Sequence, residues 1–156
     1  MPTVLIIDDE PNIRRMVGAL FGAEGYDVRD ASDGASGLLR AGESEPDVVL
    51  LDLMMPGELD GMATLERLRA AIPDSPVVMM SGRAGLSDAV RATKLGAFTF
   101  LEKPLTPEGV MFALSSAMEH YAFTTDPAAT DPAASDPAAL RETVREALLI
   151  AAGGLA

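Results

Sequence analysis

Short apolar runs recur along residues 1–121 and predict the strands of a sheet. Residues 4–7, 48–51 and 77–80 are continuously apolar, which is typical of strands buried on both faces of a parallel sheet. Residues 26–29 alternate between apolar and polar, as a more exposed strand does, and residues 98–101 form a fifth candidate.

The segments between these runs have the period of amphipathic helices. Pro11 and Pro107 suit the first turn of a helix, and Gly25 suits a helix end. Strand–helix alternation repeated five times predicts a doubly wound α/β domain, which binds ligands at the carboxyl ends of its strands. The apolar stripes are Ile13, Met16, Val17, Leu20 and Phe21; Met62, Leu65 and Leu68; and Val110, Met111, Leu114 and Met118.

The composition changes near residue 121, and a five-residue repeat then starts at Asp126, Asp131 and Asp136. Repeated Asp-Pro pairs interrupt regular structure, so we predict a linker over residues 122–139. Residues 140–156 predict a short amphipathic tail helix. A helix of about 12–15 residues is marginal alone in water, so this one needs a surface to pack on.

The bulk composition fits one folded domain and limits its partners. The chain is 48% hydrophobic and has no cysteine, which excludes disulfides and thiolate zinc sites. No apolar stretch approaches the roughly 20 residues of a membrane span, and we expect a cytoplasmic protein. The net charge of −12 disfavours direct binding to nucleic acid or to anionic membranes. Divalent cations and proteins remain as possible binding partners.

Acidic side chains follow two of the predicted strands. Asp8 and Asp9 come after the first strand and Asp52 after the third, and the ends of neighbouring parallel strands meet at one edge of a sheet. Two carboxylates about 4 Å apart repel by about 4 kcal/mol at an effective dielectric constant near 20. Mg²⁺ is held by few protein carboxylates and keeps water and phosphate oxygens as ligands. We therefore predict a magnesium site at this edge.

Donor groups follow the other strands at the same edge. Lys103 comes after the fifth strand and Ser81 after the fourth, and Gly82 permits close approach of the backbone to an anion. A nucleophilic carboxylate, a metal ion and fixed donors are the parts that phosphoryl transfer requires. Each part alone has a plainer explanation: Asp8 and Asp9 as a helix cap, Asp52 and Ser81 as turn residues, and Lys103 as a surface side chain.

Five sequence blocks together resemble the receiver domains of two-component response regulators. They are Asp8-Asp9, Asp52 with Met55-Pro56, Asp60-Gly61, Ser81-Gly82 and Lys103-Pro104. The resemblance implies a flavodoxin-like receiver domain over residues 1–121, with five parallel strands in the order 2-1-3-4-5. It also implies a phosphoacceptor switch that catalyses only its own phosphorylation and dephosphorylation.

By the same resemblance, Asp52 accepts a phosphoryl group from a histidine kinase or a phosphotransfer protein. Ser81 and Lys103 contact that group, and Phe100 matches an aromatic residue whose rotamer follows phosphorylation. A phosphorylation-dependent homodimer is one form that the output can take. The implied Mg²⁺ ligands are Asp8, Asp9, Asp52 and the backbone carbonyl of Met54.

The output of such a receiver depends on what the chain is joined to. Residues 79–83 and 94–105 are most similar to receivers that precede AAA+ enhancer-binding activators, although the loop of residues 56–61 is one residue longer than the commonest receiver loop. A stand-alone regulator acts on a separate protein target, and its tail helix would fold back over the output face. In a piece of a longer activator, the tail would begin a dimerisation helix.

An enzyme alternative is a Mg²⁺-dependent phosphohydrolase of the haloacid-dehalogenase type, which also uses an aspartyl nucleophile on a doubly wound sheet. The D-x-D-x-T pattern of that class is broken here by Asp8-Asp9-Glu10-Pro11. A nucleotide-binding domain is a weaker alternative, because the first strand leads into Asp8-Asp9 and not into a Gly-rich phosphate loop.

Overall fold

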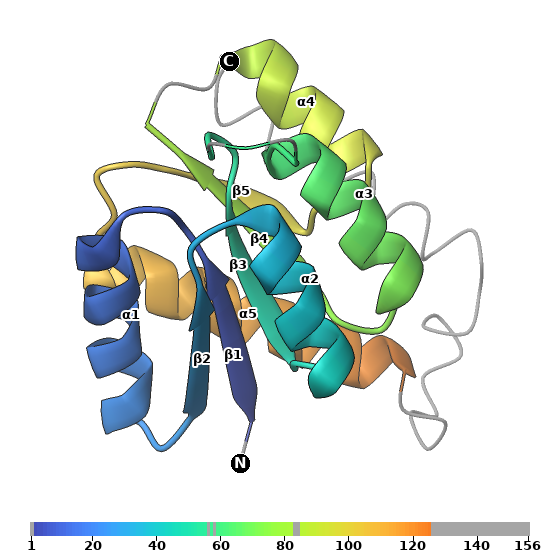
Figure 1. Cartoon of the computed structure of the whole chain (residues 1–156). Helices are drawn as coiled ribbons and strands as arrows, with labels where there is room; N and C mark the ends of the chain where they lie inside the picture. The colour runs from blue at the N-terminus through green and yellow to red at the C-terminus, as the bar shows by residue number, and fades with distance from the viewer. Residues whose placement is uncertain (1, 56, 58, 83–84, 126–156) are drawn as a thin grey trace.

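A parallel sheet with helices on both faces forms the described part of the chain, residues 2–55, 57, 59–82 and 85–125 of a computed structural model (Figure 1). The strands lie in the order β2-β1-β3-β4-β5, and every neighbouring pair is parallel. The strands are β1 (Thr3–Ile7), β2 (Asp27–Ala31), β3 (Val48–Asp52), β4 (Val77–Ser81) and β5 (Thr99–Glu102). The helices are α1 (Pro11–Ala23), α2 (Gly34–Glu43), α3 (Gly61–Ala71), α4 (Leu86–Lys94) and α5 (Pro107–Thr125).

The doubly wound fold and the strand order predicted from the sequence are both confirmed. The three continuously apolar runs lie within β1, β3 and β4. Strand β3 extends one residue further, to the polar Asp52, and β4 extends to the polar Ser81. Strands β2 and β5 begin one residue later than predicted. Pro11 and Pro107 begin α1 and α5, and Gly25 follows α1 with a positive φ of 87°.

Two hydrophobic layers lie on opposite faces of the sheet, because successive strand residues point to opposite sides. In β1, Val4 and Ile6 pack with residues of α1 and α5, whereas Leu5 and Ile7 pack with residues of α2, α3 and α4. Fully burying one such side chain stabilises the fold by about 1.5–3 kcal/mol. A slip of one residue in register would exchange the two layers, so this alternation fixes the register of each strand.

The register gathers the polar strand ends at one edge of the sheet. Ile7 pairs with Leu51, so the next residues, Asp8 and Asp52, lie at the same level on neighbouring strands. On the other side of β3, the backbone N–H of Lys103 donates to the carbonyl of Ser81 at 2.9 Å. The backbone of the sheet therefore places these side chains, and the loops do not.

Helix α5 continues to Thr125 and so includes residues 122–125, which the sequence pattern assigns to the linker. The rest of that linker, residues 126–139, and the tail helix of residues 140–156 lie outside the described residues and stay predictions. Within the described part of the chain, no helix has both the length and the apolar character needed to cross a membrane.

Candidate functional site

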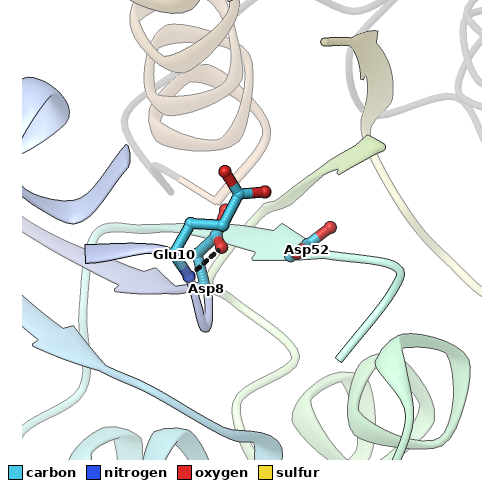
Figure 2. A group of neighbouring side chains, drawn as sticks. All are labelled: Asp8, Glu10 and Asp52. Atoms are coloured by element: carbon cyan, nitrogen blue, oxygen red, sulfur yellow. Dashed lines mark hydrogen bonds between the residues drawn. The ribbon is translucent and has the colours of Figure 1, made fainter. Parts of the chain in front are cut away.

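Two buried carboxylates stand side by side where β1 and β3 end. Asp8 is 0% exposed and Asp52 is 2% exposed. Glu10, from the turn into α1, brings a third carboxylate to the same place, and one oxygen from each of the three lies within 4.8 Å of the others (Figure 2). Like charges this close repel strongly in a partly buried site, so the group needs a positive partner.

The ammonium of Lys103 is that partner. Its Nζ lies 2.9 Å from Glu10 Oε1, 3.0 Å from Asp8 Oδ2 and 3.4 Å from Asp52 Oδ2. An ammonium has three N–H donors, so these three carboxylates can accept all of them. The Lys103–Pro104 peptide bond is cis. The sequence-predicted residues Asp8, Asp52 and Lys103 thus meet at one point.

Burial sets the protonation of the two aspartates. Burial raises the pKa of Asp52 to about 6, and the neighbouring charge of Asp8 adds to the rise, against the opposing effect of Lys103. Burial also raises the pKa of Asp8, although the Glu10 backbone N–H and the Lys103 ammonium oppose it. At neutral pH Asp52 is therefore mostly ionised, and its carboxylate is more basic than that of an exposed aspartate.

Lys103 stays protonated next to them. Burial of its ammonium works to lower the pKa, but the hydrogen bonds to Glu10 and Asp8 and the charges of Asp52 and Asp8 outweigh it, and the pKa is raised. The cluster of one ammonium and three carboxylates keeps a net negative charge. It is therefore suited to attract a further cation.

Arg14 of α1 binds the backbone of the turn that carries Asp8. The Arg14 guanidinium donates from Nη1 to the Asp8 carbonyl at 2.8 Å, and its Nε lies 3.2 Å from Asp30 Oδ2 on β2. The backbone N–H of Glu10 donates to Asp8 Oδ1 at 2.8 Å. These contacts fix the Asp8 carboxylate in the site. The N-cap residue of α1 is Glu10, not Asp8 or Asp9 as the capping alternative would have it, and its side chain makes no capping hydrogen bond.

Ser81 and Phe100 lie on the β4–β5 side of the site. Ser81 is 1% exposed and pairs with Glu102 in the sheet. Phe100 is half-buried and packs against the hydrophobic layer that contains residues of α3 and α4. Ser81 ends β4 and Phe100 lies within β5, and the roles of phosphoryl contact and switch residue both stay predictions.

Asp9 and Met54 lie on the outer side of the site. Both are exposed, and the Met54 backbone N–H donates to Asp52 Oδ1 at 3.3 Å. They line an open cavity of about 550 Å³. Asp9 is thus beside the carboxylate group and not within it, and the Mg²⁺ ligand roles of Asp9 and the Met54 carbonyl stay predictions. The cavity is also lined by Leu53, Met55, Asp60, Met62, Asp88 and Arg91.

Gly61 and Asp60 fix the return of the chain from the site to α3. The Gly61 N–H donates to the Leu53 carbonyl at 3.1 Å, and a Cβ at Gly61 would lie 2.5 Å from that oxygen and 2.6 Å from the Asp52 carbonyl oxygen. The Asp60 carboxylate caps α3 by accepting from the Ala63 N–H at 2.8 Å. Gly61, where the longer loop of residues 56–61 ends, is therefore held against the backbone of Leu53 and Asp52.

Glu10 and Arg14 are site residues that the sequence analysis did not identify. Glu10 directly follows the Asp8-Asp9 pair, so a third acid in that short segment was the available signal. Arg14 carries no motif of its own. Its contact with the Asp8 carbonyl depends on the path of α1 beside the end of β1, which the spacing of residues does not specify.

Comparison with known proteins agrees with this geometry. The sequence pattern of the response regulator receiver domain matches residues 4–115. The chain belongs to the response regulator receiver domain family. This receiver domain is 35% identical over 123 residues to the transcriptional regulatory protein GlrR of Escherichia coli (strain K12), a match that covers 79% of this chain and 28% of GlrR.

A second relative is the nitrogen assimilation regulatory protein NtrX of Azorhizobium caulinodans, which is 36% identical over 117 residues, covering 74% of this chain and 26% of NtrX. The chain thus spans about a quarter of the length of these two relatives. The crystal structure of the receiver domain of NtrX from Brucella abortus has a TM-score of 0.71 and 36% identity, with coverage of 74% of this chain and 98% of that domain.

The family match settles the class of protein. Receiver domains are the phosphoacceptor switches of two-component systems and bind Mg²⁺ at a cluster of aspartates. The predicted likeness to receivers of AAA+ enhancer-binding activators is confirmed by GlrR and NtrX. The match favours a receiver domain over the phosphohydrolase and the nucleotide-binding alternatives.

Proposed function

We propose that this receiver domain accepts a phosphoryl group on Asp52 from the phosphohistidine of a histidine kinase or a phosphotransfer protein. The observation that carries the proposal is the Asp52 carboxylate itself, which is buried at the end of β3 with Oδ2 3.4 Å from the Lys103 ammonium and with Asp8 beside it. In the transfer, an Asp52 oxygen attacks phosphorus and the P–N bond of the donor breaks. The imidazole nitrogen keeps the bonding electron pair and takes up a proton.

The residues around Asp52 suit this transfer. Lys103 places a fixed positive charge next to the attacked phosphoryl group and can pair with one of its oxygens. Ser81, at the end of β4, offers a hydroxyl and a backbone N–H to another oxygen. Since the pKa of Asp52 is about 6, most of the nucleophile is ionised at neutral pH. The domain would catalyse only its own phosphorylation and dephosphorylation.

The carboxylate group fits Mg²⁺. Hard oxygen donors from Asp8, Glu10 and Asp52 lie within 4.8 Å of one another, and two of them are buried with excess negative charge. Asp8 and Asp52 would hold the ion, with Asp9 and the Met54 carbonyl as the further ligands that the family resemblance implies. When bound, the ion neutralises charge on the phosphoryl oxygens.

The output would run through Ser81 and Phe100. A phosphoryl group on Asp52 adds negative charge and acceptor oxygens, and Ser81 would move toward them. Phe100 would then turn into the space that Ser81 leaves, which alters the surface of β5 and α4. The matched residues cover only 28% of GlrR and 26% of NtrX, so we propose a fused output domain as the part that responds to this change. The chain itself carries a net charge of −12, so we do not expect it to bind nucleic acid directly.

The intact mass of the chain after incubation with Mg²⁺ and acetyl phosphate tests the proposal. We expect one phosphoryl adduct that requires Mg²⁺ in the wild type and is absent from Asp52→Asn. Asp47→Asn, an exposed aspartate at the opposite edge of the sheet, serves as the matched control and should be phosphorylated normally. An adduct that persists in Asp52→Asn, or none in the wild type although Mg²⁺ binds, would contradict the proposal.

A further inference from the structure

The ammonium of Lys103 is shared between two kinds of carboxylate. Asp8 and Asp52 are buried, with side chains 0% and 3% exposed, whereas the Glu10 side chain is 55% exposed. The shortest of the three contacts, 2.9 Å, is nonetheless the one to Glu10. Lys103 therefore has one partner at the rim of the site and two within it.

We propose that Glu10 is a positioning residue that holds the Lys103 ammonium at the rim when a divalent cation occupies the Asp8 and Asp52 carboxylates. This inference rests on the proposed function, because it concerns the same cation and the same phosphoacceptor. Glu10 is not one of the Mg²⁺ ligands that the sequence predicts, so this role is a separate one.

Competition for the same oxygens is the physical basis of this role. A cation held by Asp8 and Asp52 would compete with the ammonium for these two carboxylates, which Lys103 contacts through Asp8 Oδ2 and Asp52 Oδ2. Two positive groups this close repel each other, so the ammonium must withdraw as the cation enters. Withdrawal without a counter-ion would leave a largely buried ammonium unpaired, which is costly.

Glu10 is placed to provide that counter-ion. Its backbone N–H donates to Asp8 Oδ1 at 2.8 Å, so its backbone is tied to the cation site. Its exposed carboxylate can follow the ammonium outward while the contact between them is kept. Lys103 would then stay within reach of an incoming phosphoryl group and would not block the cation.

The inference predicts that Glu10 acts through Lys103. In Glu10→Gln the ammonium keeps only Asp8 and Asp52 as charged partners and competes more strongly for them. We expect the Kd for Mg²⁺, measured by calorimetric titration of the whole chain, to rise about tenfold, as for other residues that orient metal ligands. Glu66→Gln, an exposed acid on α3, removes the same charge elsewhere and should leave the Kd within about twofold.

A double-mutant cycle separates this role from the alternatives. In a Lys103→Gln background, Glu10→Gln should change the Kd by less than about twofold, since the ammonium is gone. An equal loss of affinity in both backgrounds would show that Glu10 binds the cation directly and would overturn the inference, as would an unchanged Kd in Glu10→Gln. Wild-type protein that binds no Mg²⁺ would instead contradict the proposed function. Thermal unfolding of each variant checks that it is folded at the temperature of the Mg²⁺ titration.

Discussion

Replacing Gly61 with alanine is expected to lower the free energy of unfolding by about 1–3 kcal/mol, the usual range for forcing extra atoms into a packed site. The new Cβ would lie 2.5 Å and 2.6 Å from the carbonyl oxygens of Leu53 and Asp52. Both neighbours are backbone atoms of β3 and its exit, so no flexible side chain can move aside. The chain must shift where it carries the phosphoacceptor, and Mg²⁺ affinity should fall as well.

Urea unfolding of the metal-free chain measures this effect. Gly22→Ala is the matched control, because a Cβ at Gly22 in α1 meets nothing within 4 Å and the backbone there has no positive φ. That variant should be more stable than wild type by about 0.4–1 kcal/mol. A Gly61→Ala protein as stable as wild type would show that the loop after Asp52 is not held as closely as described.

Replacing Asp52 with asparagine is expected to stabilise the metal-free domain at pH 7, while it removes the phosphoacceptor. The pKa of Asp52 rises from its ordinary value of 3.8 to about 6 on folding, because burial and the charge of Asp8 penalise its ionised form. The difference corresponds to roughly 3 kcal/mol of destabilisation at neutral pH. Imperfect hydrogen bonding of the amide reduces the gain, so we expect about 1–3 kcal/mol.

The pH dependence has a definite sign. The folded state holds the Asp52 proton more tightly than the unfolded chain, so the stability that this group contributes is present below about pH 4 and is lost as the pH rises through about 6. The advantage of Asp52→Asn over wild type should therefore appear between pH 4 and pH 7 in urea unfolding curves measured with EDTA. It should be absent at pH 4.

Asp33→Asn is a control for Asp52→Asn, because folding lowers the pKa of Asp33 and raises that of Asp52. The Ser36 backbone N–H donates to Asp33 Oδ1 at 2.7 Å at the start of α2, and this hydrogen bond lowers the pKa of Asp33. Its contribution to stability is therefore lost as the pH falls, and removing its charge should give no stabilisation at pH 7. If both variants gained the same stability at pH 7, the effect would come from the general excess of negative charge and not from burial of Asp52.

Much of the fold could be predicted because β1, β3 and β4 each bury an unbroken apolar run. The runs at residues 4–7, 48–51 and 77–80 indicate strands by themselves, because strands buried on both faces of a parallel sheet have several successive apolar residues. Helices α2 and α4 were expected only from the alternation of strands and helices. Helix α2 lies against β1 through Gly37, where a Cβ would lie 2.8 Å from Ile7 Cγ1. The buried residues of α2 are Gly34, Gly37 and Ala41, so few large apolar side chains mark its packing face in the sequence.

The site was predictable as far as strands place it. Asp8, Asp52, Ser81 and Lys103 follow strand ends, and parallel register alone brings such residues to one edge. The relative positions of Asp9 and Glu10 were not predictable, because both belong to the turn after β1. Adjacent residues in a turn can point to different sides, and here Glu10 joins the carboxylate group whereas Asp9 lines the neighbouring cavity.

The separation of the core into two layers has a consequence for how a signal would leave this domain. Phe100 belongs to the layer under α2, α3 and α4, whereas the neighbouring Leu101 belongs to the layer under α1 and α5. The sheet thus separates the two layers, and repacking of Phe100 would act directly on the layer that contains residues of α4 and not on the one that contains residues of α1. Helix α5 packs on the opposite face, against β3, β4 and β5, so a change at Phe100 would have to pass through the sheet to reach it.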